Sequence, residues 1–81
     1  MENNETNYVD IAKYLKEQEA RIKEVNEFHI DENLRLKECA AIVDGTINYL
    51  WRNGFGEYEI DLLIKDMLKL ANEREIRKWI N

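Results

Sequence analysis

Four consecutive residues, Asn53-Gly54-Phe55-Gly56, constrain the fold of this chain most, because they form its one sharp break. The sequence has no proline, and two of its three glycines lie here. Apolar runs lie on either side, at residues 39–51 and 60–71. A glycine-rich break between two apolar runs is typical of a turn between antiparallel helices. We therefore predict a helical hairpin around this turn.

The order of residues in the turn predicts how it closes both helices. With Asn53 as the C-cap, Gly54 takes the next position, where a left-handed backbone costs glycine little. Phe55 is then placed to contact Leu50, which is the apolar contact of a Schellman ending. Gly56 becomes the N-cap of the following helix, and Glu59 is placed to accept its backbone N–H.

The N-terminal third predicts one long amphipathic helix, from about residue 8 to residue 29, after a disordered start at residues 1–6. Its apolar stripe repeats every three or four residues and is narrow, which is typical of close packing against one partner helix. The stripe comprises Tyr8, Ile11, Leu15, Gln18, Ile22, Val25 and His29.

Residues 28–34 leave two architectures open. Asp31 is a good N-cap, which predicts a second helix from about residue 31 to residue 53. The three-and-four spacing nevertheless runs on in phase through this joint, so helices one and two could also be continuous from 8 to 53. We expect the break and keep the continuous rod as the alternative.

The segment from Leu34 to Trp51 is apolar over more than half of its circumference, which predicts burial on more than one side. We expect Trp51 itself to pack in the core. Gly45 lies inside this helix, where glycine costs about 1 kcal/mol relative to alanine. Gly45 is therefore either a point of close packing or a local weakness.

A third helix is predicted from about residue 57 to residue 80, with acids in its first turns and basic residues near its end, as the helix dipole favours. Asn72 with Glu75 could instead cap a short separate helix. The predicted fold class is therefore all-α, within one domain spanning residues 1–81. It is either a three-helix bundle or a long helix with an antiparallel hairpin helix.

Charge and cysteine content limit the function classes. Seventeen acidic and twelve basic residues give a net charge of −5, which argues against broad binding to phosphates. Cys39 is the only cysteine, and neither a secretory signal nor an apolar run of membrane-spanning length is present. We therefore expect a cytoplasmic protein with no membrane partner.

Residues that usually carry chemistry are few. His29 has no second histidine or cysteine at metal-ligand spacing. Cys39 lies in an apolar run with no neighbouring histidine, where a thiol is usually inert. The glycines follow a helix and lack the lysine of a phosphate-binding loop. We predict no enzyme, no cofactor and no metal.

Binding to another macromolecule is the remaining hypothesis. Polar residues in an apolar seam fix register and partner choice, and aromatic side chains with polar groups are typical interface anchors. We expect Trp79, unlike Trp51, to lie outside the core, because an apolar residue near a chain terminus is hard to bury in a monomer this small. The candidate interface comprises Tyr8, Ile11, Leu15, Gln18, Ile22, Ile76, Trp79 and Ile80.

The predicted function is an acidic helical interaction module that binds and modulates a protein of unknown identity, as a homodimer or higher homo-oligomer. Inhibitors, scaffolding proteins and phage or mobile-element regulators offer an analogy in size and acidity. The alternative is a small DNA-associated transcriptional regulator that uses the basic residues of the last helix. Acids at the start of that helix would repel phosphates, so nucleic acid is not the expected partner. An enzyme with a site composed across subunits is the third possibility.

Overall fold

The structure is a computed structural model that describes residues 2–28 and 31–80, with side chains from residue 9 onward. Within this part of the chain every regular element is a helix. The helices are α1 (Glu2–Phe28), α2 (Glu32–Arg52), α3 (Glu57–Leu63), α4 (Lys65–Leu70) and α5 (Glu73–Ile76). The all-α prediction is confirmed.

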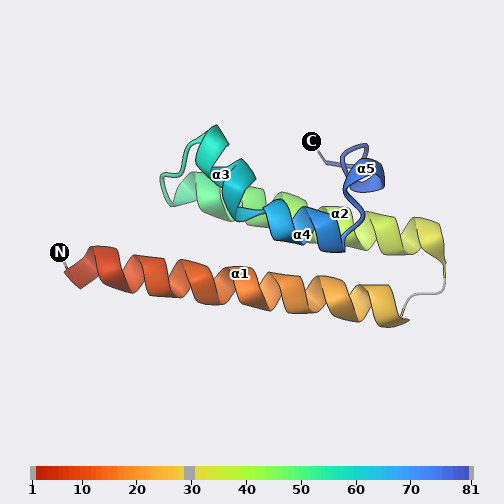
Figure 1. Cartoon of the computed structure of the whole chain (residues 1–81), viewed down its shortest axis with the longest axis horizontal. Helices are drawn as coiled ribbons and strands as arrows, with labels where there is room; N and C mark the ends of the chain where they lie inside the picture. The colour runs from red at the N-terminus through yellow and green to blue at the C-terminus, as the bar shows by residue number, and fades with distance from the viewer. Residues whose placement is uncertain (1, 29–30, 81) are drawn as a thin grey trace.

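The two long helices α1 and α2 pack antiparallel, and the three short helices lie along them (Figure 1). Helix α4 contacts α1, whereas α3 and α5 contact α2. The result is an elongated bundle of 46 × 22 × 16 Å. Its two ends differ, because the joint between α1 and α2 lies at one end and the 53–56 turn at the other (Figure 1).

Helix α1 begins at Glu2, earlier than the predicted start at residue 8, and ends at Phe28. The disorder expected for residues 1–6 stays a prediction. His29 lies outside the described residues, so the structure does not test the role expected for it.

The chain breaks between α1 and α2, so the alternative of a continuous rod is wrong. Asp31 has an extended backbone, with φ −74° and ψ 116°, and caps α2. Its Oδ1 accepts hydrogen bonds from the backbone N–H groups of Asn33 at 2.9 Å and Leu34 at 3.2 Å. These bonds satisfy donors that have no partner inside the helix. Folding back also lets α1 and α2 bury their apolar stripes against each other, which a rod could not do within one chain.

The 53–56 turn has the predicted Schellman geometry. Gly54 has a φ of +89°, in the left-handed region that glycine tolerates. Its N–H donates to the carbonyl of Trp51, and the N–H of Phe55 donates to the carbonyl of Leu50, both at 3.1 Å. Phe55 is half-buried and packs against the core. The N–H of Gly56 then donates to Glu59 Oε1 at 2.8 Å, which begins α3 as predicted.

The predicted third helix, 57–80, is divided into three. Helices α3 and α4 are nearly continuous, since the N–H of Ile64 donates to the carbonyl of Ile60 and the N–H of Leu68 to that of Ile64. The larger break is at Asn72, whose φ of +69° is left-handed and ends α4. The separate short helix that Asn72 predicted is therefore present as α5.

The core lies where α1 and α2 meet the short helices. Thr46 is one of its two polar members, and its hydroxyl donates to the carbonyl of Ile42 at 2.8 Å. Gln18 is the other, and Arg21 donates to its Oε1 at 2.9 Å. The buried apolar residues are Ile11, Leu15, Ile22, Leu36, Cys39, Ala40, Ile42, Val43, Leu50, Ile60, Ile64, Met67, Leu68, Ala71 and Ile76.

Candidate interaction surfaces

Most of the predicted interface residues lie inside the chain. The narrow stripe of α1 packs against α2 and α4 of the same molecule, so the partner helix that this stripe predicted is internal. With the fold intact, Gln18 reaches the surface only as part of the groove between α1 and α2, and the other four residues are not available to another molecule. The residues concerned are each at most 9% exposed: Ile11, Leu15, Gln18, Ile22 and Ile76.

The C-terminal residues of the predicted interface lie at the surface. Trp79 is 43% exposed, and its backbone N–H donates to the carbonyl of the buried Ile76 at 2.9 Å. Ile80 is half-buried and packs against the core. The side chain of Tyr8 lies outside the described part of the chain. Trp79 therefore remains available for contact with another molecule, whereas Ile80 is available only in part.

Three further large apolar side chains are exposed close to the 53–56 turn, and we call them the hairpin-end residues. Trp51 is 52% exposed, Tyr58 76% and Leu62 57%. The prediction that Trp51 packs in the core is wrong. Leu50 is fully buried and faces the core, and successive residues of a helix point about 100° apart, so Trp51 faces away from it. Tyr58 and Leu62 are four residues apart and out of phase with the buried Ile60, a spacing visible in the sequence.

A groove of about 480 Å³ lies between α1 and α2. Its volume is within the range of ligand pockets, roughly 300–1,000 Å³. An added Cβ at Gly45 would meet no atom within 4 Å, so Gly45 is not a point of close packing and its cost to the helix is not offset there. The groove is lined by Tyr14, Gln18, Arg21, Glu24 and Val25 from α1 and by Glu38, Ala41, Ile42 and Gly45 from α2.

An aromatic pair joins α1 and α2 beside this groove. The rings of Tyr14 and Tyr49 stack with centroids 3.8 Å apart and planes at 16°. Such pairs contribute about 0.5–1.5 kcal/mol beyond the area they bury. The pair holds the two helices together on the side where Gly45 and Ala41 leave space.

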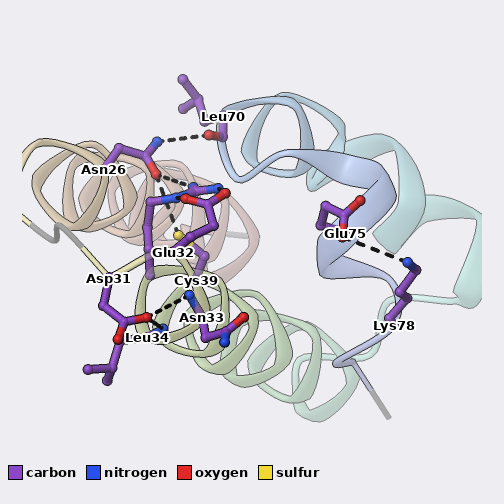
Figure 2. A network of polar contacts seen from close by, with 10 residues as sticks. Asn26, Asp31, Glu32, Asn33, Leu34, Cys39, Leu70, Glu75 and Lys78 are labelled. Atoms are coloured by element: carbon purple, nitrogen blue, oxygen red, sulfur yellow. Dashed lines mark hydrogen bonds and ion pairs between the residues drawn. The ribbon is translucent and has the colours of Figure 1, made fainter.

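A polar cluster at the other end of the helix pair is built around Asn26 (Figure 2). The Nδ2 of Asn26 donates to the carbonyl of Leu70 at 2.9 Å, and its Oδ1 accepts from Arg35 Nη1 at 2.6 Å. The carbonyl of Leu70 belongs to the last turn of α4, where helices leave acceptors without an internal partner. Asn26 therefore links α1, α2 and α4 through one side chain.

Arg35 is held in this cluster by a second residue. Its Nε and Nη2 donate to the two carboxylate oxygens of Glu32, at 2.9 and 2.8 Å. This paired hydrogen bond lowers the pKa of the Glu32 carboxyl below its ordinary value. Since Glu32 is exposed, the pair serves chiefly to orient the guanidinium toward Asn26.

Cys39 lies under the same cluster and is fully buried. Its Sγ donates to Asn26 Oδ1 over 3.8 Å. Burial raises the pKa of the Cys39 thiol above its ordinary value, although Arg35 acts in the opposite direction. The thiol is therefore protonated near neutral pH and has the character of an unreactive core residue.

The basic residues near the C-terminus are partly engaged within the chain. Arg77 Nη2 lies 3.2 Å from Glu73 Oε1. Lys78 Nζ lies 3.7 Å from Glu75 Oε2 (Figure 2). Both pairs are exposed and contribute little stability. They reduce the positive charge that a bound nucleic acid would meet. The DNA-associated alternative stays an untested prediction.

Grouped metal ligands and membrane-spanning helices are both absent from the described residues. Between residues 9–28 and 31–80, no three or more histidine, cysteine, aspartate or glutamate side chains are grouped so that they could hold a metal ion. None of the helices in the described part of the chain has the length and apolar character required to cross a bilayer. Neither a protein-family model, nor a curated protein, nor a solved structure matches this chain.

Proposed function

We propose that this protein is an acidic helical interaction module that binds and modulates a partner protein, and that it works as a homodimer. The observation that carries the proposal is the exposure of the hairpin-end residues Trp51, Tyr58 and Leu62, each more than half exposed. Tryptophan and tyrosine are the residues that most often anchor protein interfaces. A small chain that leaves both of them at one end, beside an exposed leucine, has the anchors of a binding surface.

The surroundings of these residues define the partner's chemistry. Helix α3 carries the exposed acids Glu57, Glu59 and Asp61 next to Tyr58 and Leu62. A partner surface with an apolar centre and a basic rim complements this arrangement. The tyrosine hydroxyl and the indole N–H also require hydrogen-bonding groups at the rim. The acidity of the whole chain favours approach of the same kind of partner.

A capture experiment with matched variants tests this proposal. The wild-type chain, immobilised by its N-terminus, is compared with the double variant Tyr58→Ser/Leu62→Ser in host lysate. We expect the same host protein to be retained by the wild type and reduced at least about tenfold by the double variant, as loss of interface anchors predicts. The control is Leu34→Ser, an exposed apolar-to-serine change in the first turn of α2, at the opposite end of the molecule. Equal retention by the double variant would contradict the proposal.

A further inference from the structure

The helix pair α1/α2 has two unequal sides. On one side α3, α4 and α5 pack against it and bury residues such as Ile22 and Ile76 completely. On the other side lies the groove, with exposed Ala41 and Gly45 along α2. Protein interiors are close-packed, and a chain this small gains much of its stability from each further area that it buries. The groove therefore marks a side that a further element can cover.

Phe28 is an exposed aromatic residue at helical spacing from the α1 residues that line the groove. It is 74% exposed, at the end of α1. Phe28 follows Val25 by three residues and Arg21 by seven, and both of these line the groove. Residues with this spacing lie on one face of a helix. The same face of α1 thus presents a groove and, one to two turns further along, an exposed aromatic ring.

We propose that a second copy of this chain covers the groove, with the two α1 helices antiparallel about a two-fold axis. In this arrangement Phe28 of each copy enters the groove of the other. A two-fold interface uses the same surface twice, so it needs a projecting group and a recess on one face. Phe28 and the groove meet that requirement. The inference rests on the homodimer in the proposed function and does not involve the hairpin-end residues.

Charges on the rim of the groove set the register. Arg21 and Glu24 are both exposed lining residues and carry opposite charges. If the axis passes between residues 22 and 23 of α1, Arg21 of each copy lies opposite Glu24 of the other. At about 1.5 Å per residue, Phe28 then lies about 8 Å from the axis and opposite residue 17 of the second copy. That position falls inside the groove, which spans residues 14–25 on α1.

The small residues of α2 fit the same arrangement. Residue pairs across the two helices, such as Tyr14 with Tyr49 and Asn26 with Arg35, show that Ala41 lies beside the middle of α1. The two-fold axis therefore passes close to Ala41, where the lack of a large side chain lets two α2 helices approach. Gly45 leaves further space beside it.

The first test is the mass in solution. Light scattering coupled to gel filtration at about 100 μM is expected to give twice the 9.7 kDa of one chain. Phe28→Ser, an exposed substitution that circular dichroism should show to be folded, is expected to weaken the dimer at least about tenfold. A monomeric wild type, or a Phe28→Ser variant that dimerises as tightly as the wild type, would overturn the proposal. A groove that is protected from hydrogen exchange only by a different protein would overturn it as well.

The second test uses charge reversal to examine the register. Arg21→Glu and Glu24→Arg each place like charges opposite each other in a homodimer, so each variant alone is expected to dimerise about tenfold more weakly. An equimolar mixture restores both pairs, because the glutamates of one chain face the arginines of the other. Energy transfer between labelled chains should therefore recover in the mixture. If the mixture dimerises no better than the separate variants, the register is wrong.

The two proposals fail in different ways. Phe28→Ser is expected to lose the dimer and keep the partner protein, whereas Tyr58→Ser/Leu62→Ser is expected to lose the partner and keep the dimer. A dimeric wild type whose double variant retains every captured protein contradicts the proposed function only. A monomeric wild type that loses its partner through the double variant contradicts the second-copy inference only.

Discussion

The covered and open sides of the α1/α2 pair are built from the same two helices and differ in almost every physical respect. On the covered side, Ile22 is fully buried and Asn26 joins three helices through one amide. On the open side, Tyr14 and Tyr49 stack beside a groove that no described helix of the chain fills. The difference indicates that stability is concentrated on the first side and that the second is available for association.

Ile22→Ala is expected to give the largest effect, because it breaks the covered side at its centre. Ile22 is fully buried, and such substitutions typically cost about 2–5 kcal/mol through lost burial and the cavity left behind. Urea unfolding followed by circular dichroism measures the loss. Val9→Ala, at a position that is largely exposed, is the matched control and should change the free energy of unfolding by less than about 0.5 kcal/mol.

Asn26→Ala tests the polar part of the covered side. It leaves the carbonyl of Leu70 and the Nη1 of Arg35 without their partner, which we expect to cost about 1–3 kcal/mol. Asn26→Asp removes only one of the two hydrogen bonds. A carboxylate still accepts from Arg35, but it cannot donate to the Leu70 carbonyl. Hydrogen exchange of α4 should then rise in both variants. Unchanged protection of α4 would show that the bond to Leu70 does not anchor this helix.

The features that could be predicted from the sequence are those whose causes are local. The turn closes through residues Leu50 to Glu59, and every hydrogen bond of its Schellman ending and capping bond lies within that span. The start of α2 is equally local, since Asp31 caps it through the next three residues. Backbone geometry of this kind is determined by residue type and order, and is therefore visible in the sequence.

Long-range pairing could not be predicted in the same way. The bond between Asn26 and Leu70 joins residues 44 positions apart, and neither residue signals the other. The stripe of α1 correctly indicated a partner helix, but periodicity does not say whether that helix belongs to the same chain. The exposure of Trp51 could not be predicted for the same reason. Helix α2 is apolar over much of its circumference, so its sequence does not reveal which part faces the core. The exposed hairpin-end residues and the groove both follow from such pairings.

The stacking of Tyr14 on Tyr49 is the contact through which the contribution of the open side to the free energy of unfolding can be measured. A double-mutant cycle of Tyr14→Ala and Tyr49→Ala is expected to give a coupling energy of about 0.5–1.5 kcal/mol. The ring centroids are 3.8 Å apart and the planes are inclined by 16°, so each single variant removes the same stacking contact. The cycle is best measured in the Phe28→Ser background, because the proposed dimer is expected to be at least about tenfold weaker there and to add less to stability. A coupling near zero would mean that the open side is held only by the packing of the covered side.

Gly45→Ala is expected to have the smallest effect and the opposite sign. Alanine is favoured over glycine inside a helix by up to about 1 kcal/mol, and the added methyl group meets no atom within 4 Å. We expect the Phe28→Ser chain to gain about 0.4–1 kcal/mol from this substitution, measured by urea unfolding. Ala41→Gly, at an exposed position one turn earlier on α2, should lose a similar amount. If Gly45→Ala destabilises the monomer instead, the open side is more tightly packed than the groove indicates. In the proposed dimer the same methyl group would lie close to the second copy, so a gain that is smaller in the wild type than in Phe28→Ser would agree with occupation of the groove.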